Sequence, residues 1–545
     1  MASAGLAYEP FVERWKHALV SASDARDRKS DFPSYFFDGP DAIGRGLVTT
    51  CVPHDFRVGT GANLYTATIL PALLAAEREV VLVTCFWAPS RTLDALGRTI
   101  EELAKRRKAR IAAGNTVGSS NINGSGSGEA RGGGSKEPQK LRLRIGLSSV
   151  SLFQRLFHTS KKEGYVYPPS KWARLGLPDA KTLGEAGIEM QVKSLFFNPI
   201  SVLHPKFVVV DGTVAFLPSA NVSWEPWLEG CVTVTGDVVG RLLRFYREVW
   251  EFGREGEGGV LAANTVEWDQ PAAESQFVSA GLPVVENPSM PAEHARVPLS
   301  QPRDGPSSPI ATILLPSPHH RNPRFRPFPW QKSPDPPATP LNAAIQCLLA
   351  GAQRDVYLQS PNFTCPAVLG GIIAALDRGV DVRIVAGGKK MMLLEQIVTA
   401  GTTTGRCLKK LVARYQKMAR GPGRDPNVPG PANGMLDVEQ RIRPLGNLIV
   451  SYFCPPKRRL AGGEERTDGG RMVEEPTHAH LKLTVVDGSI TVLGSGNMDR
   501  ASFFTSQELG MLFRGEEIAA GVMEVVDKAL EGRLEKSFSS VIVGS

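Results

Sequence analysis

The sequence contains no uninterrupted apolar stretch of about 18 residues, the length an α-helix needs to cross a bilayer, so we expect no transmembrane segment. Its first residues include Glu9, Glu13, Arg14 and Lys16 where a secretory signal peptide would have an apolar core. The acidic residues among them also argue against a mitochondrial transit peptide. These absences predict an intracellular, cytoplasmic protein whose contact with membranes is peripheral.

Cysteine is scarce and unpaired in its spacing. The chain has 7 cysteines, an odd number, and none of them forms a C-x-x-C pair. This pattern is typical of reduced thiols and not of a structural zinc site. The sequence also lacks a cluster of histidine, cysteine and acidic residues at metal-ligand spacing. It therefore predicts a protein that needs no metal and no other cofactor.

Neither sign of charge dominates. The 63 basic and 55 acidic residues leave a net charge of +8, a mild excess for 545 residues. Such an excess suits an anionic partner, either phospholipid or nucleic acid, without choosing between them. We find no long basic stripe with interleaved aromatic residues, which weakens the case for nucleic acid.

Two segments of the chain repeat at one constant offset. Residues 78–84 (REVVLVT) correspond to 354–360 (RDVYLQS), and residues 204–212 (HPKFVVVDG) correspond to 480–488 (HLKLTVVDG), each pair 276 positions apart. Around these segments both halves show a helix, a strand, a helix and a strand in the same order. Strands and helices that alternate in this way are typical of βαβ units with a largely parallel sheet. The sequence therefore predicts an α/β fold of two domains related by internal duplication.

The expected elements are 62–76, 78–84, 92–108 and 141–147 in the first half, and 341–351, 354–360, 367–378 and 380–386 in the second. The expected domains and connections are an N-terminal extension (1–44), a first domain (45–252) with a flexible loop (115–135), a Pro/Gly-rich linker (253–309), a second domain (310–535) with loops 421–434 and 455–477, and a C-terminal tail (536–545). Loop 455–477 contains Lys457, Arg458 and Arg459, and we expect it to be a mobile flap that meets the anionic surface of the substrate.

Each copy of the repeated H-x-K segment is predicted to form a hairpin. The Asp-Gly pairs at 211–212 and 487–488 lie between β-type runs, a strong signal for a two-residue type I′ turn. A two-residue loop sets His204 opposite Ser219 and His480 opposite Ser495. Side chains two apart on a strand share a face. One patch in each half would then gather a histidine, a lysine, a serine and an asparagine: His204, Lys206, Ser219 and Asn221, and His480, Lys482, Ser495 and Asn497.

Such a patch suits a phosphate group, because lysine and asparagine can hold its non-bridging oxygens while the imidazole acts on phosphorus or on the leaving oxygen. Seven residues of extended strand, about 23 Å, separate His204 from Asp211. Asp211 and Asp487 are therefore predicted to form turns and not to contact their own histidines. Glu229 and Glu508, each at the start of a strand-like run, are the candidates to fix the histidine tautomers.

The duplicated pattern H-x-K-x(4)-D-x(6)-G-S-x-N resembles the phospholipase D superfamily, also called the HKD family, and within it the cardiolipin synthase and phospholipase D-like branch. The second copy matches throughout, whereas the first has Pro218 in place of the usual glycine. The resemblance covers residues 45–252 and 310–535. It implies tandem α/β sandwich domains, metal-free chemistry, and two H-x-K motifs that meet across a pseudo-twofold interface. It also implies an acidic residue that orients each histidine.

We expect a phosphodiesterase that works through a phosphohistidine. One histidine attacks phosphorus, and the other protonates the leaving alcohol and then activates water or an incoming alcohol. Phospholipid is the favoured substrate, as for a phospholipase D or a phosphatidyl transferase. The alternatives are a nuclease of the same superfamily and an inactive scaffold on the same fold. Phe86, Trp87 and Phe363 are candidates to line the lipid cleft. Family habit favours His204 as nucleophile, but the near symmetry of the sequence leaves the choice open, as it does the oligomeric state.

Overall fold

A computed structural model describes most of both halves. The described residues are 6–23, 46–119, 140–150, 164–197, 201–251, 296–298, 308–317, 335–420, 444–455, 467–468, 471–472 and 475–541. Loop 421–434, most of the linker 253–309 and most of the expected flap 455–477 lie outside them.

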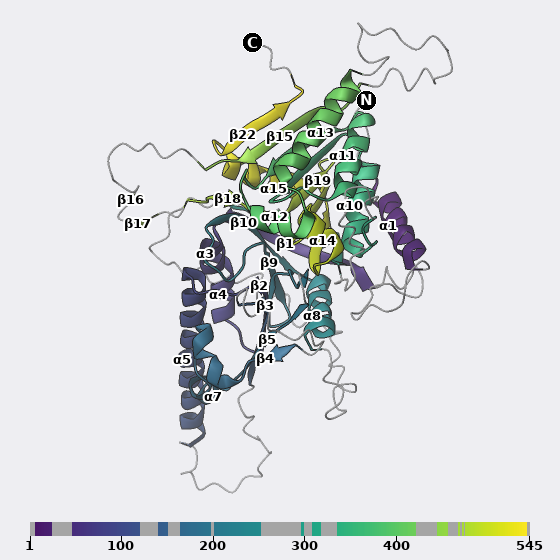
Figure 1. Ribbon diagram of the computed structural model, residues 1–545. Helices are drawn as coiled ribbons and strands as arrows, with labels where there is room; N and C mark the ends of the chain where they lie inside the picture. Colours follow the sequence, from purple (N-terminus) through teal and green to yellow (C-terminus); the bar gives the residue numbers. More distant parts are fainter. Residues whose placement is uncertain are drawn as a thin grey trace, which may run out of the picture.

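The first half is a sheet with helices on both faces (Figure 1). Three strands run parallel at its centre, and a hairpin, a long strand and an edge strand complete it antiparallel. In spatial order the strands are β4 (Tyr165–Val166), β5 (Ile188–Ser194), β3 (Leu141–Ser149), β2 (Glu79–Phe86), β8 (Phe207–Val210), β9 (Val214–Pro218), β10 (Trp227–Thr235) and β1 (Val48–Gly59).

The second half repeats this order. Its three parallel strands are followed by the equivalent hairpin and two further antiparallel strands. In spatial order the strands are β22 (Leu534–Ser539), β15 (Leu448–Phe453), β14 (Asp381–Ala386), β13 (Asp355–Ser360), β19 (Leu483–Val486), β20 (Ile490–Gly494), β21 (Glu508–Arg514) and β12 (Ile310–Ser317). The structure therefore confirms the predicted α/β class and the internal duplication.

Strand β1 joins the two sheets. Its first four residues pair antiparallel with β12 of the second half, while Val52–Gly59 pair with β10 of the first. The short β11 (Arg296–Pro298), which falls inside the expected linker, adds to β1 at Asp55–Arg57. Two smaller pairs, β6 (Phe196–Phe197) with β7 (Ser201–Val202) and β16 (Thr467–Asp468) with β17 (Arg471–Met472), stand apart. Among the described residues, the halves thus share one continuous sheet of 18 strands.

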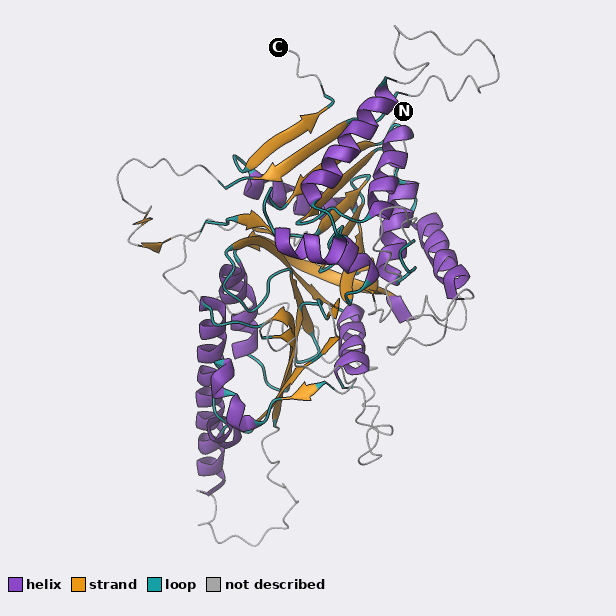
Figure 2. Cartoon of the chain, viewed as in Figure 1, coloured by secondary structure: helices purple, strands orange, loops and turns teal. Residues whose placement is uncertain are grey.

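Helices cover both faces of each half (Figure 2). The first half has α3 (Gly61–Leu64), a π-helical turn (Tyr65–Ile69), α4 (Leu70–Leu74), α5 (Arg91–Ser119), α7 (Ala180–Glu185) and α8 (Asp237–Trp250). The second has α10 (Pro340–Gly351), α11 (Pro366–Asp377), α12 (Leu393–Ala400), α13 (Thr404–Ala419), α14 (Arg500–Phe504) and α15 (Glu516–Leu530). Leu96, Ile100 and Leu103 of α5 recur every three or four residues and are fully buried, which is why this segment packs as an amphipathic helix.

The N-terminal helix α1 (Tyr8–Ser23) packs on the second half. Its Phe11, Trp15 and Leu19 are fully buried, and the Trp15 indole N–H donates to the Pro340 carbonyl at 2.9 Å. Residues assigned to the N-terminal extension therefore complete the core of the distant half. At the other terminus, β22 takes the first residues of the expected tail into the sheet.

The hairpin turns form at the predicted Asp-Gly pairs. Asp211 and Gly212 both have positive φ, at 53° and 69°, and so do their counterparts Asp487 and Gly488. The predicted register is wrong by one residue, however. Val210 pairs with Val214 and Val486 with Ile490, so three residues separate the paired positions in each hairpin. The third residue closes the turn through its own N–H and shifts every later pair.

The two turn aspartates hold each hairpin to the strand beside it. The Asp211 carboxylate accepts the backbone N–H groups of Glu77, Arg78 and Glu79. Asp487 accepts those of residues 353–355 in the same way, and that of Leu6 as well, at 2.8 Å. Both aspartates therefore lie in the turns, as predicted. Asp487 also binds the backbone of Leu6, near the N-terminus.

Replacement of Asp487 by alanine is expected to lower the free energy of unfolding by about 3 kcal/mol, because four backbone N–H groups lose their acceptor in a site that is 1% exposed. Asp211→Ala should cost less, since its turn is partly open to water. Urea denaturation followed by circular dichroism measures both. Equal loss in the two variants would contradict the role given to burial.

Candidate active site

The two H-x-K histidines are bonded to glutamates of the opposite halves. His204 Nδ1 lies 2.8 Å from Glu508, and His480 Nδ1 lies 2.7 Å from Glu229. Since a carboxylate only accepts hydrogen bonds, the proton of each neutral imidazole sits on Nδ1 and the Nε2 lone pair is left for chemistry. The sequence indicated both glutamates but not this crossing.

Backbone contacts set up the crossed pairs. The His204 N–H donates to the Gln507 carbonyl at 2.9 Å, and the His480 N–H donates to the Leu228 carbonyl at 2.8 Å. Gln507 and Leu228 directly precede Glu508 and Glu229 in the chain. Each H-x-K segment therefore runs beside the other half's glutamate, which brings the four side chains together at the interface.

The serines of the G-S-x-N segments lie behind the glutamates. The Ser219 hydroxyl donates to Glu229 and the Ser495 hydroxyl donates to Glu508. The sequence predicts these hydroxyls on the phosphate-facing patch, but the one-residue shift of the hairpins places them beside the carboxylates. Glu508 accepts a further hydroxyl, that of Ser502, at 2.7 Å. Sequence reasoning missed Ser502, because the first copy has no equivalent serine.

The motif lysines turn back onto their own histidine segments. Lys206 Nζ donates to the His204 carbonyl at 3.0 Å. Lys482 Nζ donates to the His480 carbonyl at 2.7 Å and also to His480 Nε2 at 2.8 Å. His480 is therefore a neutral acceptor toward Lys482, whereas no such contact is recorded between Lys206 and His204.

Burial and crowded positive charge shape the acidity of this cluster. Burial lowers the pKa of Lys482 to about 7, and the neighbouring Lys206 adds to the effect. Burial likewise lowers the pKa of His204, and it lowers that of His480 well below its usual range, helped by the charges of Lys482, Lys206 and His204. Residues from both halves thus feel one another's charge, as expected of a single site.

The two glutamates differ. Burial raises the pKa of Glu229, a change that its serine bond and the two lysines only partly oppose. Burial acts on Glu508 in the same direction, but the charge of His204 and the bonds from His204, Ser495 and Ser502 outweigh it and lower the pKa. The negative charge is therefore more stable on Glu508, beside His204, than on Glu229, beside His480.

The two motif asparagines are placed differently. Asn497 donates its amide nitrogen to Asp499 at 2.9 Å, while its Oδ1 is buried without a partner among the described residues. Asn221 accepts the Phe86 N–H at 3.3 Å. Asp499 in turn accepts from Asn362, two residues after the end of β13, so the second-copy asparagine belongs to a wider polar network.

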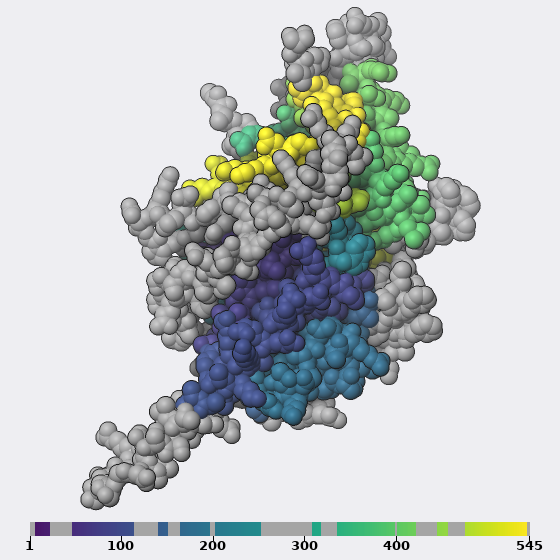
Figure 3. Space-filling model, turned by 90° about the vertical axis from the view of Figure 1, so that its left-hand side faces the viewer, coloured from purple at the N-terminus to yellow at the C-terminus, as the bar shows by residue number. Residues whose placement is uncertain are grey.

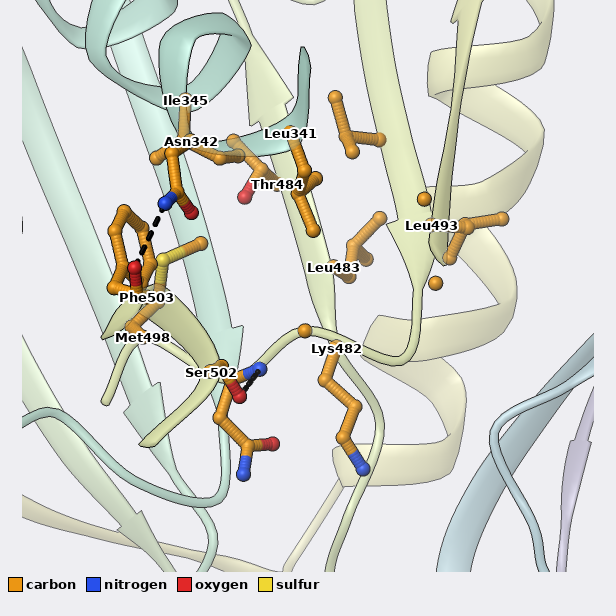
Figure 4. A pocket seen from close by; sticks show the side chains of 15 residues that line it. Leu341, Asn342, Ile345, Lys482, Leu483, Thr484, Leu493, Met498, Ser502 and Phe503 are labelled. Carbon is orange, nitrogen blue, oxygen red and sulfur yellow. Dashed lines mark hydrogen bonds between the residues drawn. The ribbon is translucent and has the colours of Figure 1, made fainter. Parts of the chain in front are cut away.

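A narrow cavity of about 20 Å³ lies between α10 and the β19–β20 hairpin. Figure 4 shows Lys482 at one end of it, pointing away from Leu341 and Leu493. That volume fits one water molecule and no substrate. Access to the cluster is instead on the His204 side, whose side chain is 13% exposed against 2% for His480.

Three further expectations concern the surroundings. Trp87 is 2% exposed and Phe363 is fully buried, so both belong to the core and do not line a cleft; the Trp87 indole is held by the Leu175 carbonyl. The ring of Trp227 lies over His480 instead, with 4.7 Å between centroids.

Among the described residues, no three His, Cys, Asp or Glu side chains gather as a metal site would require. Within the same residues, no helix is both long and apolar enough to cross a bilayer.

Residues 345–530 match the family model described as "Cardiolipin synthase, PLD-like domain". This part of the second half is therefore similar to the phospholipase D-like domains that the family model describes. The similarity supports an enzyme of the phosphodiesterase or phosphatidyltransferase class. No protein with a curated description matches the sequence at a significant level.

Several solved structures align with the chain. Phosphatidylserine synthase from Haemophilus influenzae is 12% identical and aligns over 90% of this chain and 89% of its own, with a TM-score of 0.46. The phospholipase D family member Nuc from Salmonella typhimurium is 16% identical over 36% of this chain and 91% of its own, with a TM-score of 0.22. NucT from Helicobacter pylori is 14% identical over 35% of this chain and 87% of its own, with a TM-score of 0.21. These scores are too low to carry information about substrate.

The acidity of Lys482 predicts a pH-dependent affinity for oxyanions. An anion binds best to the charged ammonium, so affinity should fall as the pH rises through about 7, by at most about tenfold per pH unit. Calorimetric titration with tungstate between pH 6 and 9 measures this slope, and Lys482→Met should flatten it. Equal affinity at pH 6 and pH 9 would show that the lysine stays charged in the free protein.

Proposed function

We propose that the protein is a metal-independent phosphodiesterase that acts on phospholipids through a phosphohistidine, as a phospholipase D or a phosphatidyl transferase. The observation that carries this proposal is the crossed pairing of His204 with Glu508 and of His480 with Glu229 in one buried cluster. Each half supplies one imidazole, while the two-step reaction needs a nucleophile and an acid.

His204 is the proposed nucleophile. Its side chain is the more exposed of the two, and its partner Glu508 holds the firmer negative charge, which stabilises the imidazole as the bond to phosphorus forms. His204 Nε2 attacks phosphorus, the P–N bond forms, and the P–O bond to the leaving alcohol breaks. Attack by water or a second alcohol then breaks the P–N bond.

His480 is the proposed acid and base. In the free protein Lys482 donates a hydrogen bond to His480 Nε2. A proton therefore already lies beside the ring nitrogen that must protonate the leaving oxygen. Binding of the anionic phosphodiester offsets the crowded positive charge of the lysines and favours protonation of the imidazole. His480 then takes a proton from the incoming water or alcohol in the second step.

Lys206, Lys482, Asn221 and Asn497 are the proposed contacts of the non-bridging oxygens. Burial lowers the pKa of both lysines in the free site, and a bound phosphodiester anion would raise it again and stabilise their charged forms. Ser219 and Ser495 act as positioning residues through the glutamates. No step calls for a metal ion.

The roles of the two histidines predict different responses to the leaving group. His204→Asn and His480→Asn should each reduce kcat on a phosphodiester with an alkyl leaving group by roughly a thousandfold or more. A p-nitrophenyl phosphodiester needs no acid to release its phenolate. On this substrate His480→Asn should retain a burst of one nitrophenolate per enzyme and an acid-labile phosphoenzyme, while His204→Asn should give neither. The opposite pattern would exchange the two roles.

A substrate screen tests the choice of lipid. Phosphatidylglycerol or phosphatidylcholine vesicles with a short-chain alcohol should give the phosphatidyl-alcohol, phosphatidic acid, or both, and exhaustive EDTA treatment should leave the rate unchanged. His480→Asn is the matched control. His204-dependent cleavage of single-stranded DNA, with no lipid product, would assign the nuclease function instead. Loss of activity in EDTA that Zn²⁺ or Ca²⁺ restores would contradict the metal-free chemistry.

A further inference from the structure

Helix α12 exposes large apolar side chains. Leu393 is 42% exposed, Leu394 76% and Ile397 51%, and at 100° per residue they share one side of the helix. They make up half of the 6 large hydrophobic side chains that are exposed in the described part of the chain. Such a gathering on one short helix marks a surface that meets an apolar partner.

Helix α13 follows after three residues and carries a basic stripe. Its five cations, together with Arg420 directly after it, fall at helical spacings of 3, 4, 8, 11 and 14 from the first, on the side opposite the buried Leu408, Leu411 and Tyr415. All six are exposed, and no acidic residue occurs from 404 to 420. The stripe is Arg406, Lys409, Lys410, Arg414, Lys417 and Arg420.

The two helices belong to one outer side of the second half. Figure 1 draws α12 and α13 in front of its sheet, with α12 near the level where the two halves meet. In the turned view of Figure 3, the green surface of the second half lies on the right-hand side. Helix α12, with its exposed apolar side chains, and the basic helix α13 are thus consecutive in sequence and lie on the same side of the sheet.

Polar contacts tie α12 to the candidate active site. The Gln396 side chain donates to Asn362 at 2.7 Å and accepts the N–H of Thr404, the first residue of α13. Asn362 donates to Asp499, which also accepts from the motif residue Asn497. The exposed helix is therefore held at a fixed position relative to the catalytic cluster.

We propose that α12 and α13 form the surface by which the enzyme docks on an anionic lipid bilayer, with α12 entering the headgroup region and α13 lying against the charged headgroups. This inference rests on the proposed phospholipid substrate. An anionic bilayer is the complementary partner. The apolar side chains of α12 match its acyl-chain interior, and the six cations match its anionic headgroups.

Nucleic acid fits this surface less well. Single strands are held by aromatic side chains on which bases stack. The exposed side of α12 offers leucine and isoleucine, and the one aromatic residue of α13, Tyr415, is buried. The stripe could bind phosphates, but the apolar half would have no partner.

The test separates docking from catalysis. Lys409→Gln/Lys410→Gln/Arg414→Gln should lower partition onto phosphatidylglycerol vesicles about a hundredfold at low salt, since each cation near an anionic surface contributes about a fivefold factor. Leu394→Gln/Ile397→Gln should also weaken binding, with less dependence on salt. Vesicle sedimentation in the His480→Asn background measures both without turnover. The matched control is Lys105→Gln/Arg106→Gln/Lys108→Gln on α5, which removes the same charge from the other half and should bind as the parent does.

Turnover distinguishes failure of this inference from failure of the proposed function. Both docking variants should lose activity on vesicles yet keep the parent rate on a short-chain phospholipid below its critical micelle concentration. Unchanged vesicle binding and vesicle turnover would overturn the docking surface while leaving the lipid activity in place. A parent enzyme that is inactive on both lipid forms would overturn the proposed function. Vesicle sedimentation would still test the docking surface in that case. Loss of single-stranded DNA binding in the α13 variant, without loss of vesicle binding, would assign the surface to nucleic acid.

Discussion

The crossed histidine–glutamate pairs are the constraint on which the rest of the structure depends. Buried carboxylates and imidazoles are costly unless each finds a partner in good geometry. Here the partners come from opposite halves, so neither half can satisfy its own polar groups. The shared strand β1 and the backbone bonds at Gln507 and Leu228 are the means by which the two sheets are held at the required distance.

Duplication provides the parts of this site, and small departures from it provide the chemistry. The Ser502 hydroxyl strengthens the charge on Glu508, while Glu229 has only Ser219 and His480 as side-chain donors among the described residues. Lys482 reaches its histidine ring, and Lys206 stops at a backbone carbonyl. Two nearly identical motifs thus present one imidazole with an open edge and another that already shares a proton. This inequality suits a reaction in which the two histidines have different roles.

The sequence predicted the duplicated fold well, because a constant offset of 276 residues and clear βα alternation report on topology directly. The turn residues Asp211 and Asp487 were predicted for the same reason, since Asp-Gly between β-type runs has a local cause. The crossing of Glu229 and Glu508 was not predictable, because it depends on contacts between halves. The register failed by one residue, because pairing beyond a turn depends on a third residue that closes it. The basic stripe of α13 was not predicted, because its cations lie on one side only once the helix is formed.

The burial of α1 against the second half has a consequence for the order of synthesis. Leu6 donates to Asp487, 481 residues later, and Trp15 donates to Pro340. As the chain leaves the ribosome from its N-terminus, Phe11, Trp15 and Leu19 have no final partner until the second half has been made. At about 5–20 residues per second, that interval is on the order of half a minute or more. Over this time the apolar face of α1 is open to chaperones and to wrong partners, so the yield of folded enzyme should depend on what covers it first.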